Sequence, residues 1–153
     1  SGETVHTVTA VGNAQLDKLK SFVAIRERNY KFLVKVFGKY PDYFRIPVVL
    51  PDARPQWQIF PVTIKKNPLF ERLELVKFLE SNNVQTRPLA TGNILRQPGF
   101  TKIPHRDTAK SYPHTDEVME GGFMVGVHQG LTPEHLNKLK DVLDAFFKTK
   151  LTP

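Results

Sequence analysis

The chain has 153 residues, of which 40% are hydrophobic and 24% charged, and it contains no cysteine. This length suits one domain with its own core, and this composition excludes wholesale disorder, a disulfide framework and a thiol nucleophile. No apolar run is long enough to cross a bilayer, so we expect a cytoplasmic protein without a membrane anchor. The formal net charge of +7 and the isoelectric point near 9.7 favour an anionic partner, which could be nucleic acid, an acidic membrane surface or a phosphorylated small molecule.

The first predicted element is a long amphipathic helix over about residues 9–37. Apolar residues recur there at steps of three and four, which is the spacing of one helix face: Leu16, Leu19, Val23, Tyr30, Leu33 and Phe37. Gly38 and Pro41 follow and end the helix. The cationic residues of this helix, including Arg26, fit a solvated face, with a binding role as the alternative.

Two predicted strands follow the helix, at Phe44 to Leu50 and Gln56 to Lys65. Both segments are rich in β-branched and aromatic residues, which favours strands. Their prolines confine them to sheet edges, strand starts or bulges. Trp57 lies in the second segment, and we expect it to belong to the core or an interface.

The next predicted helix begins at Asn67-Pro68, where an N-cap residue precedes a proline in the first turn, and it runs to Glu80. A strand over Val84 to Leu89 follows. It leads into a segment from Ala90 to His114 that has no helical or strand period. Long irregular connections inside a compact domain are usually functional or disordered. We interpret the stretch from Val84 to Phe100, which carries Arg87 and Arg96 into this connection, as a functional loop. The segment from Ala90 to His114 is also the most basic part of the chain.

A short helix is expected from Thr115, a brief strand from Phe123 to Val127, and a final helix that Thr132-Pro133 caps. Helices and strands therefore alternate, while some strands are also neighbours in the sequence. This order predicts an α+β fold, in which helices cover one face of a small, mostly antiparallel sheet. We expect residues 1–153 to form a single domain.

Common catalytic signatures and standard metal-ligand spacings are absent from the sequence, so no metal site is expected. The candidate binding residues are Arg87, Asn93, Arg96 and His128. Arginine can hold a phosphate or carboxylate bidentately, and an asparagine amide can both donate to and accept from hydroxyl groups. That chemistry suits a nucleotide sugar.

These residues also have structural interpretations, which the pattern alone leaves open. Arg87 could form an ion pair, Asn93 could occupy a left-handed position in a turn with Gly92, and His128 could lie at an interface. The second interpretation follows from the tolerance of asparagine for left-handed backbone.

Three stretches of the chain carry a resemblance to a known family. They read TAVGNAQLDKLKSFVAIRERNYKFL, RLELVKFLESNNVQTRPLATGNILRQPGF and TDEVMEGGFMVGVHQGLTPEHL. Together they resemble the C-terminal part of the DegT/StrS-type sugar aminotransferases, which use pyridoxal phosphate (PLP). The G-N…R-Q-P loop and the G-V-x-x-G-L-T ending are most similar to the branch of CDP-4-keto-6-deoxyglucose 3-dehydrases of lipopolysaccharide sugar synthesis.

The resemblance implies that the chain is the small domain of a larger fold type I PLP enzyme, normally a homodimer. It implies that Arg87, Asn93, Arg96 and His128 grip a nucleotide sugar and position it over PLP. The residues that anchor PLP belong to an N-terminal domain that this chain lacks, so the chain alone is expected to bind no cofactor and to be inactive. Whether the parent enzyme is a dehydrase or an aminotransferase depends on that domain.

The sequence departs from the family pattern in two places, with Gln129 where relatives usually have proline and Asn13 where an apolar residue is usual. Two other functions stay open on the residues alone. One is a stand-alone binding module for anionic sugar nucleotides. The other, less favoured, is a nucleic-acid binder that stacks bases on Phe100 and Tyr112.

Overall fold

The structure is a computed structural model that describes residues 2–106 and 111–151. Its helices are α1 (Gly2–Leu16), α2 (Leu19–Gly38), α3 (Arg72–Ser81), α4 (Pro113–Gly121) and α5 (Pro133–Leu151). Its strands are β1 (Phe44–Arg45), β2 (Ile59–Ile64), β3 (Thr86–Pro88) and β4 (Gly122–Gly126), and the short 3₁₀ helices η1 (Ile94–Arg96) and η2 (Pro98–Phe100) lie between β3 and α4. Along these residues, no helix combines the length and the apolar character that a membrane crossing requires.

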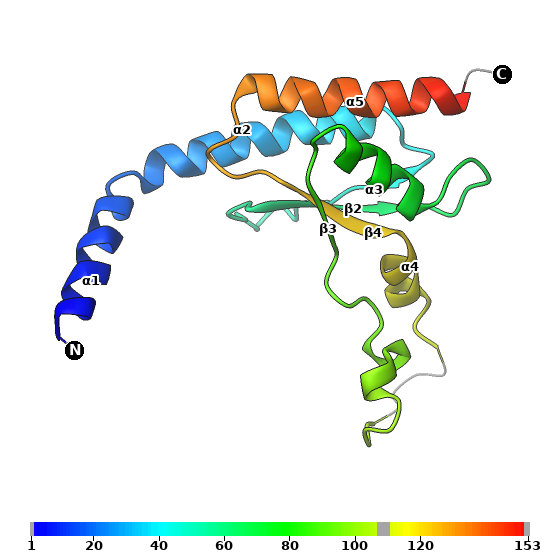
Figure 1. Ribbon diagram of the computed structural model, residues 1–153, viewed down its shortest axis with the longest axis horizontal. Helices are drawn as coiled ribbons and strands as arrows, with labels where there is room; N and C mark the ends of the chain where they lie inside the picture. Colours follow the sequence, from blue (N-terminus) through cyan, green and yellow to red (C-terminus); the bar gives the residue numbers. More distant parts are fainter. Residues whose placement is uncertain (1, 107–110, 152–153) are drawn as a thin grey trace.

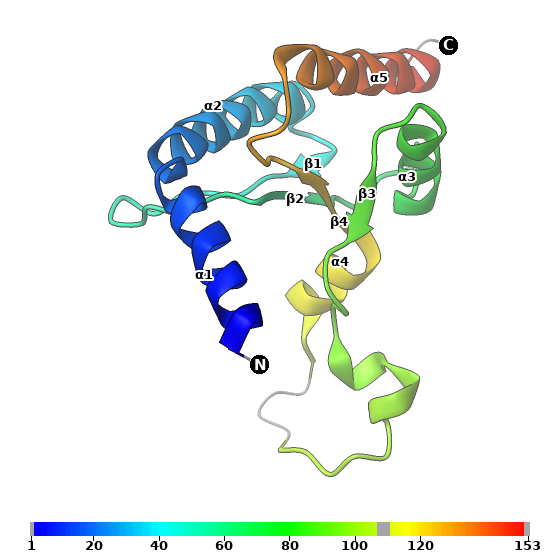
Figure 2. The same cartoon turned by 60° about the vertical axis from the view of Figure 1, so that its left-hand side comes forward.

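The strands form one antiparallel sheet in the order β1-β2-β4-β3. Helices α2, α3 and α5 lie on one side of this sheet, whereas α4 and the η1–η2 segment extend from its other side (Figures 1 and 2). Helix α1 projects away from the sheet at the opposite end from α4. This arrangement confirms the predicted α+β fold with a mostly antiparallel sheet.

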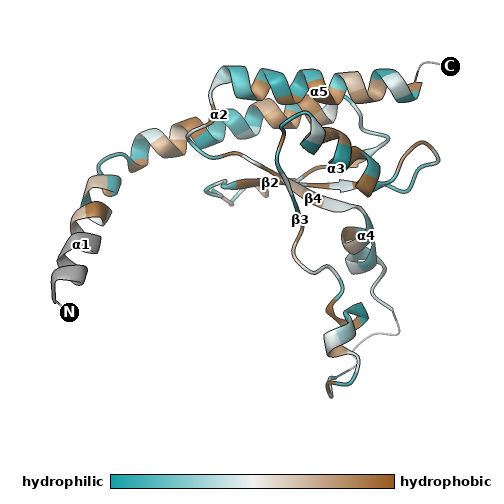
Figure 3. Cartoon of the chain, viewed as in Figure 1, coloured by the Kyte–Doolittle hydropathy of each residue, from teal (hydrophilic) through white to brown (hydrophobic). Residues whose placement is uncertain are grey.

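One hydrophobic core fills the space between the sheet and its covering helices. Phe60 of β2 and Phe123 and Val125 of β4 point into it, because alternate residues of a strand share a face. Phe37 of α2 stacks on Phe60 with ring centroids 5.4 Å apart. Hydrophobic and hydrophilic residues alternate along α2 and α5, as expected for helices with one covered side (Figure 3).

The prediction of one continuous helix over about 9–37 is wrong at Asp17 and Lys18, where α1 ends and α2 has not yet begun. The Lys18 N–H donates to the carbonyl oxygen three residues earlier (3.1 Å), which interrupts the regular α-helical series. Leu16 and Leu19, which belong to the periodic stripe, are exposed. Periodicity alone could not show that the stripe is left uncovered at this point.

The expected strand over Phe44 to Leu50 is limited to Phe44–Arg45. The chain leaves the sheet before Pro47, which has no N–H for the ladder, and the Tyr30 hydroxyl donates to the Pro47 carbonyl oxygen (3.3 Å). The second strand is confirmed with the shorter bounds Ile59–Ile64.

The helix predicted from Asn67-Pro68 begins later, at Arg72. Asn67 does accept backbone hydrogen bonds through Oδ1, from the N–H groups of Leu69 (2.9 Å) and Phe70 (3.1 Å). These bonds close a local turn in place of a first helical turn. The amide that indicated a helix start therefore caps the connection that precedes the helix.

The later elements agree more closely with their predictions. Helix α5 begins at Pro133 as expected, and α4 begins at Pro113, two residues before the expected start. Strand β3 is confirmed within its predicted range. The segment after it is more ordered than predicted, since η1 and η2 lie within it, while Asp107 and its neighbours to 110 lie outside the described residues.

Candidate functional site

One face of the sheet is not covered by α2, α3 or α5, and Arg87 lies on it. Arg87 is directly opposite Met124 in the β3–β4 pair, so the two side chains point to the same face. The neighbouring residues Phe123 and Val125 point to the other face, where they are buried in the core. The Arg87 side chain is consequently exposed, with its guanidinium available to an anion.

His128 follows β4 and lies over the same open face. A Cβ built on Gly126 would lie 3.3 Å from His128 Cδ2, and position 126 points to the same side as Met124. At a rise of about 3.3 Å per residue, the four positions from Met124 to His128 separate His128 from Arg87 by about 13 Å along the strand. The two residues share a face without touching, at a spacing that an extended nucleotide sugar can span.

Asn93 and Arg96 meet at a carboxylate that sequence reasoning did not select, Asp116 of α4. Asp116 Oδ1 accepts from Asn93 Nδ2 (2.7 Å) and from Arg96 Nε (2.6 Å), and its Oδ2 accepts from Arg96 Nη2 (2.6 Å). The Arg96 side chain is 60% exposed and the Asp116 side chain 18%. The Arg96 guanidinium, followed by the Asn93 amide, lowers the pKa of Asp116, and the carboxylate raises the pKa of Arg96.

The turn that carries Asn93 is packed against α4. Gly92 has a φ of 63°, and a Cβ built there would lie 2.3 Å from Met119 Cβ, so the site requires glycine for both backbone and space. Asn93 itself has a φ of −79° and uses Oδ1 to accept from the Leu95 N–H (3.1 Å). The interpretation of Asn93 as the left-handed residue is therefore wrong, because Gly92 occupies that conformation.

Open hollows adjoin this turn. One of about 280 Å³ is lined by Gly92, Asn93, Ile94, Leu95, His105, Arg106, Tyr112 and Thr115. Another hollow of about 390 Å³ is lined by Leu89, Ala90, Gly92, His114, Thr115 and Val118. Both hollows combine apolar walls with polar or cationic groups, which suits a small ligand with an apolar ring and an anionic group.

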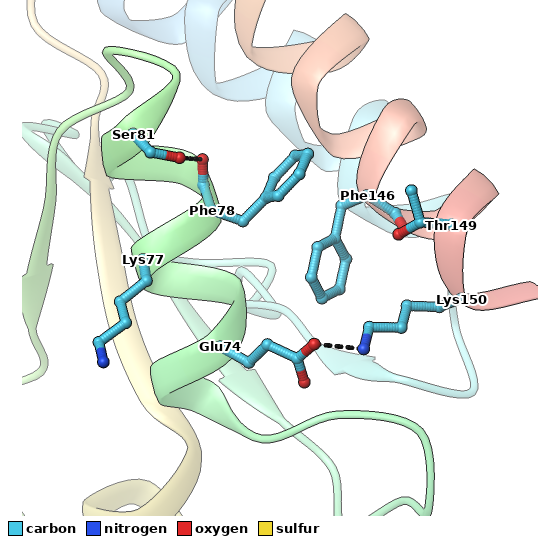
Figure 4. A pocket seen from close by; sticks show the side chains of 7 residues that line it. All are labelled: Glu74, Lys77, Phe78, Ser81, Phe146, Thr149 and Lys150. Atoms are coloured by element: carbon cyan, nitrogen blue, oxygen red, sulfur yellow. Dashed lines mark hydrogen bonds and ion pairs between the residues drawn. The ribbon is translucent and has the colours of Figure 1, made fainter.

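A further hollow, of about 490 Å³, lies between α3 and α5 (Figure 4). Phe78 and Phe146 point toward one another in it, with ring centroids 5.3 Å apart, and Glu74 pairs with Lys150 at its rim. None of the four candidate residues lines this hollow. We therefore place the candidate site on the open sheet face and the 90–97 turn.

The structure thus brings the candidate residues together in pairs. Arg87 and His128 share the open face, and Asn93 and Arg96 share Asp116, but no hollow described above contains all four. Sequence reasoning missed Asp116, although an acid at the start of a helix that follows a basic loop is a detectable signal. It also missed Asn29, a buried polar residue in the apolar stripe of α2, which contacts the backbone at His128.

The candidate residues do not fit the reactive end of PLP. That cofactor is held through a Schiff base with a lysine, and none of the four candidate residues is a lysine. The four residues offer guanidinium, amide and imidazole donors to a ligand, while the nearby acid, Asp116, is already engaged by Arg96 and Asn93. No chemical step at PLP is therefore assigned to this chain.

Comparison with known proteins establishes the class of this chain. The model of the DegT/DnrJ/EryC1/StrS aminotransferase family matches residues 6–144. The chain belongs to this family, which confirms the resemblance that its motifs carry.

Two curated proteins and one solved structure are similar to this chain. The chain is 34% identical over 138 residues to lipopolysaccharide biosynthesis protein RfbH of Salmonella typhimurium, and 33% identical over 144 residues to dTDP-4-dehydro-2,6-dideoxy-D-glucose 3-dehydratase of Saccharopolyspora spinosa. These matches cover 90% and 94% of this chain but 31% of each relative, so the chain spans about a third of their length. A structure of GDP-4-keto-6-deoxymannose-3-dehydratase with a trapped PLP–glutamate geminal diamine matches with a TM-score of 0.76 at 28% identity, over 88% of this chain and 34% of that one.

Proposed function

We propose that residues 1–153 form the small C-terminal domain of a homodimeric PLP enzyme that dehydrates or transaminates a nucleotide-linked 4-keto-6-deoxyhexose. The products belong to the synthesis of lipopolysaccharide or O-antigen sugars. The domain binds the nucleotide sugar, and PLP is held by parts of the enzyme outside these residues. The observation that carries this proposal is the open sheet face, which α2, α3 and α5 leave uncovered and on which Arg87 and His128 are both exposed.

The names of the relatives support the substrate class. One is a lipopolysaccharide biosynthesis protein, and two are 3-dehydratases of nucleotide-linked keto sugars. In the proposed complex the Arg87 guanidinium contacts a phosphate oxygen, and His128 contacts a sugar oxygen. Arg96 uses its Nε–Nη2 edge for Asp116, so it offers a ligand the opposite edge.

The test is steady-state kinetics of the whole enzyme with a CDP-linked 4-keto-6-deoxyhexose. Replacing Arg87 by alanine is expected to raise KM about tenfold or more, because a charge-assisted hydrogen bond to phosphate contributes about 1.5–3 kcal/mol. Lys138→Ala, which removes an exposed cation from α5, is the matched control and is expected to leave KM unchanged. An unchanged KM in Arg87→Ala would overturn the binding role.

A second measurement separates the enzyme from the other two candidate functions. The whole protein, reconstituted with PLP, is expected to show a visible chromophore that borohydride alters. A protein that stays colourless would favour the stand-alone binding module. Affinity for single-stranded nucleic acid that falls by orders of magnitude over a modest rise in salt would favour a nucleic-acid binder.

A further inference from the structure

Asn29 is a fully buried polar residue on the covered stripe of α2, with 0% of its surface exposed. A buried amide is unfavourable unless its hydrogen bonds are made. Its Nδ2 donates to the carbonyl oxygens of Val127 (3.4 Å) and His128 (3.1 Å), and its Oδ1 accepts from the Arg28 guanidinium through Nη2 (3.0 Å) and Nε (3.3 Å). Asn29 therefore fixes the backbone where β4 ends.

The residue after His128 is held by a second contact from the same helix. Arg26 donates to Gln129 Oε1 through Nε (2.9 Å) and Nη2 (2.8 Å). These two hydrogen bonds hold the side chain of Gln129 against α2. Asn29 thus holds the main chain at Val127 and His128, and Arg26 holds the side chain of the next residue, Gln129.

The imidazole ring of His128 is restrained as well, between two glycines. A Cβ on Gly126 would lie 3.3 Å from Cδ2, and a Cβ on Gly130 would lie 3.1 Å from Nδ1, so larger residues at either position would push against the ring. The Gly130 N–H donates to His128 Nδ1 (3.2 Å). Because Nδ1 accepts this bond, the proton of the neutral ring is on Nε2.

We propose that Asn29 is a positioning residue that holds His128 as an Nε2–H donor on the open sheet face, directed at an oxygen acceptor of the bound sugar nucleotide. This inference rests on the proposed function for the identity of the ligand. The geometry of the His128 ring does not depend on a ligand. It assigns ligand binding to Nε2 of His128, and it explains why the polar residue Asn29 lies among the buried residues of α2.

The geometry is tested without ligand by long-range ¹H–¹⁵N spectra of the histidine rings in the 153-residue chain at a pH where they are neutral. The signal of His128 is identified by its loss in His128→Gln. The wild type is expected to show a protonated Nε2 and an unprotonated Nδ1, and Asn29→Ala to shift both nitrogens toward the average of the two tautomers. A protonated Nδ1 in the wild type would overturn the proposal.

A second variant covers the case in which Asn29→Ala does not fold. Gly130→Ala leaves Asn29 in place but adds a methyl group against Nδ1, and it is expected to produce the same shift toward mixed tautomers. Gly99→Ala is the matched control, because a Cβ there meets no atom within 4 Å. Unchanged His128 signals in Gly130→Ala would contradict the role of the Gly130 contact.

The ligand is tested in the whole enzyme by two replacements of His128. The amide nitrogen of glutamine takes roughly the place of Nε2, whereas that of asparagine falls nearer Nδ1. His128→Asn is expected to raise KM about fivefold more than His128→Gln, a difference of about 1 kcal/mol, which is the net contribution of one hydrogen bond. Equal effects, with Arg87→Ala still raising KM, would overturn this inference and leave the proposed function standing. An unchanged KM in Arg87→Ala would instead count against the proposed function.

Discussion

The two faces of the sheet are held by different kinds of interaction. On the covered face, α2, α3 and α5 pack aromatic and aliphatic side chains against Phe60, Phe123 and Val125, and these residues are almost fully buried. On the open side, Arg96 and Asn93 meet at Asp116 in a polar cluster, and the 90–97 turn packs on α4 through Gly92 and Met119.

This difference separates stability from binding. The apolar area removed from water on the covered face supplies most of the free energy of folding, since each buried aromatic side chain contributes several kcal/mol. The core residues lie on the covered face, so exposed side chains of the open face such as Arg87 are available to a ligand. Four substitutions test this division, from the largest expected effect to the smallest.

Phe37→Ala should destabilise the chain most. The Phe37 side chain has 0% exposure and contacts the rings of Phe44, Phe60 and Phe123. Its loss is expected to lower the free energy of unfolding by about 3–5 kcal/mol, measured by urea denaturation. Phe100→Ala is the control, because Phe100 is 41% exposed and should change stability by less than about 1 kcal/mol. Similar losses in both variants would contradict the division.

Gly92→Ala should have the next largest effect, and a local one. The added Cβ would overlap Met119 Cβ and place alanine at a φ of 63°. We expect a loss of about 1–3 kcal/mol, with faster amide exchange in the 90–97 turn and α4 but not in α2. Gly99→Ala should leave exchange unchanged. Equal protection of the turn in both variants would show that the packing of Gly92 on Met119 is dispensable.

Asp116→Asn should have a smaller effect that depends on pH. The pKa of Asp116 is lowered in the folded state by Arg96 and Asn93, so its contribution is complete above the ordinary aspartate pKa and disappears as pH falls through the folded value. The variant should therefore have a lower Tm than the wild type at pH 7, and the two values should converge between about pH 5 and about pH 2. A Tm difference that persists in acid would show that the ion pair is not its cause.

Arg87→Ala should change stability least. Arg87 is exposed on the open face, and substitutions of such residues usually stay within about 0.5 kcal/mol. Thermal unfolding of the variant and the wild type should coincide, in contrast to the large expected effect on KM. A clear loss of stability would favour the alternative in which Arg87 forms a structural ion pair.

The sequence predicts the covered side better than the open side, for a physical reason. Burial of one helix face makes apolar residues recur at helical spacing in the sequence. The pairs Leu33 and Phe37, and Leu139 and Leu143, have this spacing and are buried. The left-handed residue after α3 was also predictable, because Asn83 has a φ of 61° and asparagine tolerates that region. Fold class and the order of elements follow from such local signals.

The errors arise where distant contacts decide the structure. The stripe of the first helix is regular through Leu16 and Leu19, but whether a partner covers it depends on elements far along the chain. The pairing of Asn93 and Arg96 on Asp116 joins positions 20 or more apart, and no local pattern encodes it. Asn29 is the intermediate case, because a polar residue within an apolar stripe is visible, whereas its partners at the end of β4 are not.

Strand β4 lies at the centre of the sheet, although it is the last strand to be synthesised. Until it leaves the ribosome, β2 and β3 have no common partner, and the apolar side chains of β2 have no complete sheet to join. A nascent chain in this state exposes unpaired strand edges, which are prone to aggregate. The strand order therefore delays completion of the sheet until β4 has been synthesised.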